Sequence, residues 1–390
     1  MKASLRHLRL VLAVAATGSV TRAAQQCHIS QPAVTTAIAG IEATLGVPIF
    51  DRRPGGSSLT AAGHVLSLRI RRALAVLDPA LADLSPRLIR TASMAQLNAL
   101  IAVAETESFA AAARRLGLAQ PTVHRAVSQI EREVGHHLFD RKPHGVIPTR
   151  AVRHLAMAAR LAFVELDLAL ADVADLAGQE VGRVVIGAMP LSRSVLLGPA
   201  IALFRAEWRT LPVRVVEGPY AELVLGLRRG ETDFLVGALR PETDDLAQEM
   251  LFQDEMAIVA RPGHPALRGG PTLDALAGFA WVIAPEGTPA RDHFTAMFSA
   301  ADRALPLSLV ETGSMALLTD LVGQTDHLGF VSARQVARDI NAGRLAAVPF
   351  QPRGTSRPIG LTTRRGWCPT RAQAGMVAAI RLAAGQATAA

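Results

Sequence analysis

Apolar and polar residues alternate along the first part of the chain with the period of amphipathic helices. Over residues 94–105 the apolar positions include Leu97, Leu100, Ile101 and Ala104. This spacing of three and four residues places them on one face of a helix with 3.6 residues per turn. The pattern predicts a helix that buries this face against neighbouring elements.

Two further helices are predicted directly after it. Ser108 is suited to cap a helix over residues 109–116, and Gly117 is suited to end it in a left-handed conformation. A short turn over residues 118–120 leads to Pro121, a residue tolerated in a first helical turn, and a third helix is expected to run to about residue 133. Two short helices joined by a tight turn indicate a helix-turn-helix.

The same segment occurs twice. Residues 8–60 align with residues 97–149 without a gap at a shift of 89, with about twenty identities. Shared fragments are Ser-x-x-x-Ala-Ala, Gln-Pro-x-Val, Ile-Glu and Phe-Asp-Arg. After each third helix, an apolar pair and a basic turn indicate a β-wing. The chain is therefore predicted to begin with two helix-turn-helix units.

A helical pattern follows each repeat, and the pattern changes again beyond it. Residues 149–176 and, more weakly, residues 63–84 are apolar at helical spacing, and residues 178–182 resemble a hinge. From residue 183 onward short β-branched runs alternate with helical patterns. The strand-like runs are 184–187, 213–216 and 234–237, and the helical patterns are 195–208 and 220–229. This βαβαβ order favours a parallel sheet covered by helices.

The remaining segments predict a second lobe. Residues 250–260 are expected to form one strand that crosses to it, and strand-like runs recur at 281–283, 309–310 and 328–331. Residues 359–362 form the expected return strand, and residues 370–382 the closing helix. The predicted fold class is multidomain: two mostly α-helical winged units and a two-lobed α/β domain.

Charge is concentrated in the duplicated part. The 390 residues carry a net charge of +8, of which residues 1–150 contribute +9 and the remainder −1. A basic module joined to a neutral domain is typical of a protein that binds a polyanion such as DNA. Half of the residues are hydrophobic, but no uninterrupted apolar run reaches the ~18 residues that span a bilayer. A membrane protein is not expected.

The N-terminus resembles a secretory signal, because Lys2, Arg6 and Arg9 precede an apolar run over residues 10–16. The same apolar pattern recurs internally at residues 97–104, which favours a helix of a folded unit. Cys27 and Cys368 offer no spacing suited to a disulfide framework or a metal site. We therefore expect a cytoplasmic protein with no metal and no cofactor.

Polar residues at the start of each third helix are candidates for contacting DNA. Such groups can donate to or accept from base edges in the major groove or phosphates. In the second repeat the candidates are Gln120, Thr122, His124 and Arg125, with Arg141 and Lys142 on the wing. In the first repeat they are Gln31, Thr35 and Thr36, with Arg52 and Arg53 on the wing.

Only the second of these helices carries a cation, so the second repeat is predicted to be the stronger DNA reader. The first is expected to extend the footprint, to pair subunits, or to be degenerate. A helical bundle without a DNA role is the plain alternative, and the charge asymmetry argues against it.

Taken together and in order, these fragments resemble the winged helix-turn-helix of the LysR-type transcriptional regulators. The chain departs from that family in one respect, because family members usually carry one such unit. Residues 230–237 (Gly-Glu-x-Asp-Phe-Leu-Val-Gly) and 260–265 (Ala-Arg-Pro-Gly-His-Pro) resemble the family's periplasmic-binding-protein-like sensor domain. Residues 216–223 and the ending Arg-Pro-Ile-Gly-Leu-Thr-Thr resemble its galactose-binding-protein regulators.

The resemblance implies a domain order and partners. Expected are a winged unit over 1–62, a linker helix over 63–93, a second winged unit over 94–150, and a linker or dimerisation helix over 151–180. An effector-binding domain follows over 181–385, with one lobe near 181–254 and 350–385 and the other near 255–349. The implied partners are double-stranded DNA, RNA polymerase, a small effector and further copies of the chain in a dimer or tetramer.

An effector is expected in the crevice beyond the carboxyl ends of the strands. Met189, Ser192, Glu217 and Tyr220 follow strands of the first lobe, and Thr288, Gly313 and Ser314 belong to the second. The plain alternatives are that Ser192 and Ser314 cap helices and that Tyr220 packs. The subgroup resemblance implies a sugar or a small carboxylate, and helix N-termini favour an acid.

Two other classes of protein fit the sequence less well. An enzyme would need a catalytic motif, and the sequence contains no Gly-x-Ser-x-Gly elbow, phosphate-binding loop, Gly-x-Gly-x-x-Gly turn or His-Glu-x-x-His pair. Cys368 has no evident partner for nucleophilic chemistry. A solute-binding protein would need an export signal and no basic duplicated half. The sequence predicts a transcription regulator and not an enzyme.

Overall fold

The computed structural model describes residues 4–53, 56–143, 145–241 and 243–389. The chain divides into an N-terminal unit, residues 1–183 together with the short segment Arg228–Gly230, and a C-terminal unit formed by Val184–Leu227 and the residues from Glu231 onward. No helix in the described ranges is long and apolar enough to cross a membrane.

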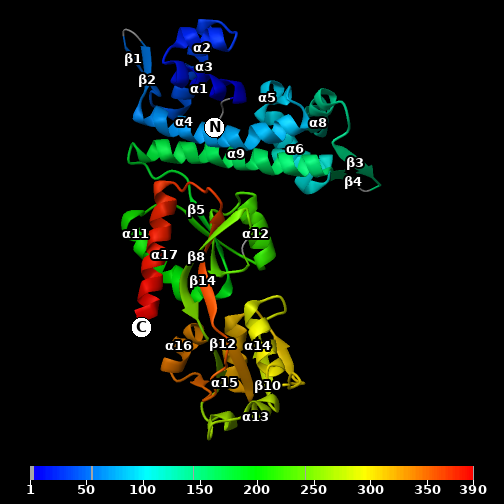
Figure 1. The fold of residues 1–390 in the computed structure, drawn as a ribbon, viewed down its shortest axis with the longest axis vertical. Coiled ribbons are helices and arrows are strands. Elements are labelled where there is room, and N and C mark those ends of the chain that lie inside the picture. Colours follow the sequence, from blue (N-terminus) through cyan, green and yellow to red (C-terminus); the bar gives the residue numbers. More distant parts are fainter. Residues whose placement is uncertain (1–3, 54–55, 144, 242, 390) are drawn as a thin grey trace. The chain divides into compact units, whose positions relative to one another are not determined.

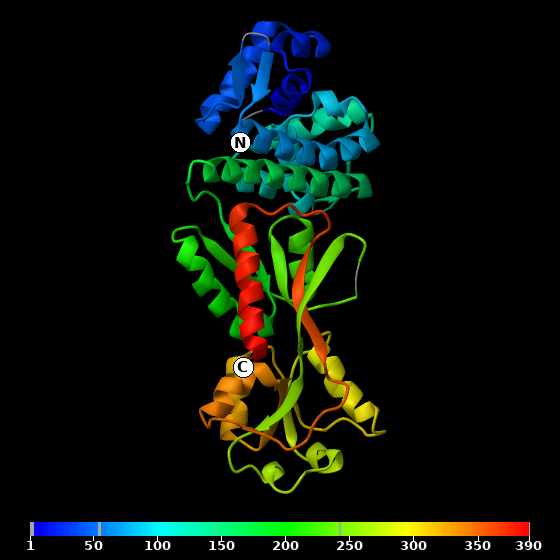
Figure 2. The same cartoon turned by 60° about the vertical axis from the view of Figure 1, so that its left-hand side comes forward.

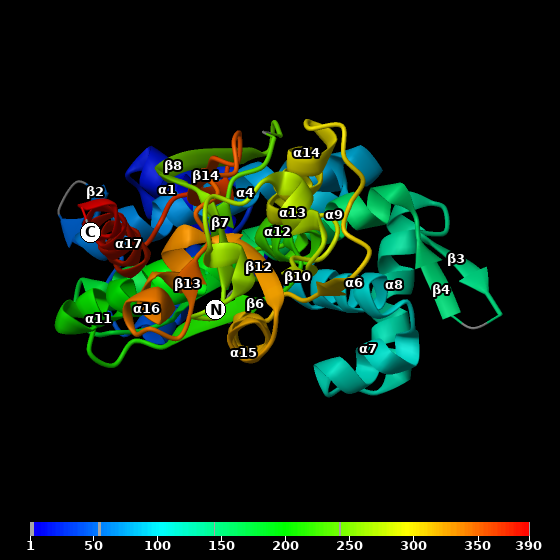
Figure 3. The same ribbon diagram turned by 90° about the horizontal axis from the view of Figure 1, so that it is seen from below.

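The N-terminal unit contains two winged units of the same design (Figure 1). Winged unit 1 consists of α1 (Leu5–Thr17), α2 (Val20–Gln26), α3 (Gln31–Leu45), β1 (Phe50–Arg53) and β2 (Gly56–Leu59). Winged unit 2 consists of α6 (Met94–Thr106), α7 (Phe109–Leu116), α8 (Gln120–Val134), β3 (Phe139–Lys142) and β4 (Gly145–Pro148). The strands form antiparallel hairpins in both, and β3–β4 projects clearly in Figure 3. The predicted helices and wings are confirmed.

The repeated residues perform the same local tasks in both winged units. Ser19 caps α2, and Ser108 caps α7. The Glu42 carboxylate accepts hydrogen bonds from the amides of Ile49 and Phe50 (2.9 and 3.3 Å). These two hydrogen bonds link the third helix to the start of the wing.

The second unit repeats this link with Glu131, whose carboxylate accepts from the Leu138 amide (2.9 Å). Each wing is also joined to the turn after the first helix. Ser57 donates to the carbonyl of Gly18, and Val146 donates to that of Glu107, both at 2.8 Å. The identities between the repeats therefore include the residues that place the wing.

Each winged unit continues into a long helix, and the two helices pack against each other. Helix α4 (Ala61–Leu84) follows winged unit 1 and is joined by the short α5 (Leu88–Thr91) to winged unit 2, which continues into α9 (Arg150–Asp175). Helices α4 and α9 lie side by side and form the most extensive helix contact of the unit. The apolar face of the predicted linker helix is thus covered by a helix of the same chain.

The C-terminal unit contains two five-stranded sheets. The first has the order β6-β5-β7-β14-β8, from β5 (Val184–Ala188), β6 (Val213–Glu217), β7 (Phe234–Ala238), β8 (Leu246–Asp254) and β14 (Arg357–Arg364). The second has the order β11-β10-β12-β9-β13, from β9 (Met256–Ala260), β10 (Ala280–Ile283), β11 (Leu309–Glu311), β12 (His327–Ser332) and β13 (Ala346–Ala347). The predicted alternation of strands and helices is confirmed.

Three sequence expectations need correction. Residues 250–260 do not form one strand, because β8 ends at Asp254 in the first sheet and β9 begins at Met256 in the second. The strands of the predicted βαβαβ segment, β5, β6 and β7, are parallel as expected. Neither complete sheet is purely parallel, however, since β14 pairs antiparallel with β7 and β9 pairs antiparallel with β12. The helix expected over residues 195–208 is divided into a π-helical turn (Arg193–Leu197) and α11 (Gly198–Glu207).

Helices cover each sheet and bury the apolar residues of its strands. Helix α11 packs on α17 (Arg371–Ala389) beside the first sheet, and α17 is the red helix in Figure 2. The second sheet is flanked by α13 (Leu273–Ala277), α14 (Pro289–Ser299), α15 (Met315–Gln324) and α16 (Ala333–Asn341). The core beside β10 is aromatic, because the fully buried Trp281 packs edge-on against Phe294 and Phe298.

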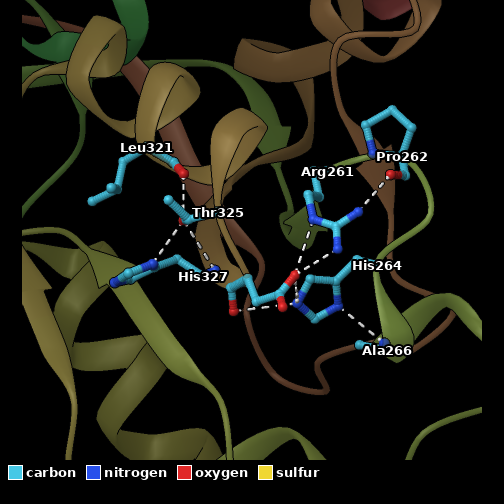
Figure 4. A network of polar contacts seen from close by, with 8 residues as sticks. Arg261, Pro262, His264, Ala266, Leu321, Thr325 and His327 are labelled. Carbon is cyan, nitrogen blue, oxygen red and sulfur yellow. Dashed lines mark hydrogen bonds and ion pairs between the residues drawn. The ribbon is translucent and has the colours of Figure 1, made fainter.

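The segment at residues 260–265, which carried part of the family likeness, has a structural task. Arg261 donates to the carboxylate of Asp326 (2.9 Å), and the buried His264 is within 3.2 Å of the Asp326 carbonyl (Figure 4). The other ring nitrogen of His264 accepts a hydrogen bond from the amide of Ala266 (3.0 Å). These bonds hold the turn after β9 against the start of β12.

Candidate DNA-reading surfaces and effector cavity

The start of α8 presents polar groups on one side and buries apolar groups on the other. Its buried residues are Val123, Val127 and Ile130. The exposed side chains are the predicted ones, Gln120, Thr122, His124 and Arg125. This division leaves four hydrogen-bonding side chains available to a groove of DNA.

His124 differs from the other three because it is held by neighbours. Its ring lies 5.1 Å from that of Phe109, and its Nδ1 is 3.3 Å from the hydroxyl of Ser128. On the wing of this unit, Arg141 and Lys142 are exposed on β3. Arg125 is thus the cation of the helix start, and the wing adds two more.

Winged unit 1 offers a different surface. Gln31 and Thr36 are exposed on α3, Thr35 is half-buried, and Val34, Ala37, Ile38 and Ile41 face inward. Arg52 and Arg53 end β1, but their side chains lie outside the described part of the chain. The two third helices therefore have the same apolar face and different polar faces.

Sequence reasoning missed the residues that position these surfaces. The glutamate of the shared Ile-Glu fragment has a structural task, because Glu42 and Glu131 hold the wings through their carboxylates. The signal was present, because both repeats place the glutamate seven residues before the amide that it binds.

A cavity of about 620 Å³ lies between the two lobes of the C-terminal unit. Six of the seven predicted effector residues line it: Met189, Glu217, Tyr220, Thr288, Gly313 and Ser314. Ser192 does not line the cavity. It is fully buried, and its hydroxyl lies 2.7 Å from the Met189 carbonyl and 2.8 Å from the Val236 carbonyl.

Several helices begin at this cavity. Thr288 caps α14, Ser314 caps α15, and Ser332 caps α16, each with its side-chain oxygen. The amides of a helix start carry partial positive charge. Ser314 therefore lines the cavity and caps a helix at once, so the effector-binding and helix-capping interpretations of this residue are compatible.

Two arginines that sequence reasoning did not single out also line the cavity, Arg240 and Arg357. The guanidinium of Arg240 lies over the ring of Tyr220, 5.0 Å from its centroid. Burial lowers the pKa of Arg240, and the nearby Arg357 adds to this effect. Among the described residues no carboxylate lies within ion-pair distance of Arg240, and Asp292 acts on it only from farther away.

Arg357 is neutralised by the fold itself. Its guanidinium donates to the fully buried carboxylate of Asp254 (2.9 and 3.0 Å), and the Ser332 hydroxyl donates to the other oxygen of that carboxylate (2.7 Å). Nearby, burial and then the charge of Arg357 lower the pKa of His293. Of the two cavity arginines, only Arg240 has its charge uncompensated at close range within the described residues.

No cluster of histidine, cysteine or carboxylate side chains suited to a metal ion occurs in the ranges that the structure describes. The N-terminal unit thus offers two helix-turn-helix surfaces, and the C-terminal unit a two-lobed ligand cavity. This combination defines the class of ligand-responsive DNA-binding proteins.

Comparisons with known proteins specify the class. The family model for the LysR substrate binding domain matches residues 177–383. The model for the bacterial regulatory helix-turn-helix protein of the lysR family matches twice, at residues 5–64 and 94–153. The chain therefore belongs to the LysR family of transcription regulators and is not an enzyme.

Relatives of known name cover different shares of the chain. The regulator GalR of Pseudomonas putida is 37% identical over 97% of this chain and 96% of its own length. PcaQ of Agrobacterium fabrum is 30% identical over 74% of this chain and 94% of its own length. GbpR of Azospirillum brasilense is 27% identical over 68% of this chain and 79% of its own length. The match to GalR thus includes the region of both winged units.

Solved structures share the fold. Full-length OxyR of Pseudomonas aeruginosa matches with a TM-score of 0.55 at 21% identity, covering 74% of this chain and 94% of that one. The LysR-family regulator CbnR matches with a TM-score of 0.51 at 22% identity, covering 75% and 99%. These likenesses confirm the fold class of winged helix-turn-helix and two-lobed sensor.

Proposed function

We propose that this regulator binds operator DNA chiefly through winged unit 2 and responds to a small carboxylate in the cavity between its lobes. The observation that carries the choice of ligand is Arg240. It is a half-buried cation in the cavity wall, and no described carboxylate pairs with it at close range. A bound carboxylate would supply the missing charge.

The remaining wall supports an anion as well. The starts of α14 and α15 lie at the cavity, and amides at a helix start bind anionic groups. The ring of Tyr220 beneath Arg240 would orient the guanidinium. Glu217 also lines the cavity and would favour a ligand that carries a hydroxyl or amine besides its acid group.

For DNA, the second unit has the stronger chemistry. Arg125 can bind guanine bidentately, and Arg141 and Lys142 can bind phosphates. Winged unit 1 has no cation at the start of its third helix. We further propose that the protein acts in the cytoplasm as a homo-oligomer and that it reaches RNA polymerase from its operator.

The test is calorimetric titration of the full chain with a panel of small carboxylates and neutral sugars. Arg240→Gln should weaken carboxylate binding about tenfold or more, because it removes a hydrogen bond to a charged group. Arg268→Gln is the matched control, since it removes an exposed arginine of the same unit that does not line the cavity.

Two results would contradict this assignment. One is tight binding of a neutral sugar with no binding of carboxylates. The other is a carboxylate affinity that is the same in Arg240→Gln as in Arg268→Gln. The DNA role is tested separately, because Arg125→Ala and Arg141→Ala should remove most operator affinity.

A further inference from the structure

The internal repeat extends beyond the winged units into the long helices. With the same shift of 89, eight of the eleven buried residues of α4 coincide with buried residues of α9. The apolar pairs include Leu66 with Leu155, Ile70 with Ala159, Ala73 with Ala162, Leu77 with Leu166, and Ala80 with Ala169. The same face of both helices is therefore used for the same contact.

Ion pairs show how the two helices are oriented. Arg69 of α4 contacts Glu165 and Asp172 of α9 (2.8 and 2.7 Å), whereas Asp83, farther along α4, lies 3.7 Å from His154, near the start of α9. The helices are thus antiparallel, as Figure 1 shows. Two equivalent helices that pack antiparallel through equivalent faces are related by an approximate two-fold axis.

The winged units follow this symmetry. Each precedes one of the paired helices, so they lie at opposite ends of the pair (Figure 1). A helix of 24 residues such as α4 is about 36 Å long. That length is close to the ~34–36 Å between half-sites on one face of B-DNA.

Opposite charges meet across the contact when α4 packs on α9, because Arg69 of α4 faces two carboxylates of α9. They would not meet in this way if α9 packed on a second α9. The position in α9 that corresponds to Arg69 is Ala158. Two α9 helices packed in the same way would bring Glu165 and Asp172 against Ala158 in place of an arginine, and only His154, the partner of Asp83 at the corresponding position, would lie near Asp172. Buried carboxylates without a cation are costly. The charges therefore favour pairing between the two repeats over pairing of α9 with itself.

We infer that each chain by itself forms a two-unit DNA reader whose two neighbouring half-sites differ in sequence. This inference rests on the DNA-binding role proposed above. The half-site of winged unit 2 should contain a guanine read by Arg125. The half-site of winged unit 1 should be read by Gln31 and Thr36, whose side chains suit adenine and the thymine methyl group.

The test is selection of bound sites from random duplex DNA by the full chain, followed by sequencing. Wild-type protein should select two unlike half-sites with centres about 10 base pairs apart. Arg125→Ala should remove sequence preference from one half-site only, and the double substitution Gln31→Ala with Thr36→Ala from the other half-site only. Arg338→Ala, an exposed arginine of the C-terminal unit, is the control for loss of charge and should leave both half-sites unchanged.

Three outcomes would overturn the inference. If all half-sites are identical inverted copies, the two units do not read DNA as an unequal pair. If both sets of substitutions affect the same half-site, or the substitutions in α3 affect none, winged unit 1 is not a reader. If wild-type protein enriches no sequence, the DNA role itself fails, which separates that failure from the first two.

Discussion

Removal of Arg69 should destabilise the N-terminal unit more than the loss of any exposed arginine. The Arg69 side chain is 2% exposed, and those of Glu165 and Asp172 are 15% and 17% exposed. In Arg69→Ala, Arg72 still pairs with Glu165 (3.0 Å), but Asp172 keeps its charge without that cation. Breaking a buried pair in this way costs about 3–5 kcal/mol, a large share of the ~5–15 kcal/mol typical of a folded domain.

The composition of the two units makes the assay selective. All three tryptophans, Trp208, Trp281 and Trp367, belong to the C-terminal unit, so their fluorescence in urea follows that unit. Far-UV circular dichroism follows the helices of both. In Arg69→Ala, part of the circular dichroism signal should be lost at a lower urea concentration than in the wild-type protein. The tryptophan fluorescence transition should stay at the wild-type urea concentration. Arg71→Ala, an exposed arginine on the same helix, should change stability by no more than about 0.5 kcal/mol.

The effect should also depend on pH. Burial raises the pKa of Asp172 even though Arg69 opposes the shift. Without Arg69 the pKa should rise further, and a carboxyl that binds a proton more readily when folded gains stability as the pH falls. The loss of stability in Arg69→Ala relative to the wild-type protein should therefore be largest near neutral pH and smaller near pH 5. Equal stability of Arg69→Ala and Arg71→Ala at neutral pH would refute the reasoning.

Two further predictions concern winged unit 2. Glu131→Ala removes the acceptor of the Leu138 amide. It should lower the free energy of unfolding by about 1–3 kcal/mol and weaken DNA binding, because the wing is displaced. An unchanged circular dichroism melt together with unchanged operator affinity would show that the bond does not position the wing. Arg141→Ala should lower affinity for all DNA sequences alike and reduce the slope of log affinity against log salt by about one, as fluorescence anisotropy at several salt concentrations can measure. A loss confined to one sequence would instead assign Arg141 to a base.

Much of the N-terminal unit could be predicted because its signals are local and repeated. Helix caps such as Ser108 act within three residues, and the apolar spacing of α6 and α8 needs no distant partner. The repeat added a second, independent reading of each signal. Even the role of Glu131 was within reach, since its partner is seven residues away.

The remaining features depend on residues far apart in the sequence. Arg69 and Asp172 are separated by 103 residues, as are Asp254 and Arg357. Pairing of α4 with α9 could not be read from amphipathicity, which predicts a buried face but not what covers it. For the same reason Arg240 was not distinguished from other arginines, because its importance follows from the cavity around it.

The junction between the lobes has a consequence for regulation. Asp254 ends β8 and Arg357 begins β14, at the two places where the chain passes between the sheets, whereas Ser332 ends β12 within the second sheet. One buried carboxylate therefore joins both crossing segments to the second lobe. Arg357 also faces the cavity. A ligand that accepts a hydrogen bond from this guanidinium competes with Asp254 for it and so weakens the contact between the two crossing segments. The same side chain, Arg357, would then both contact the ligand and change the contact between the lobes, without intermediate residues.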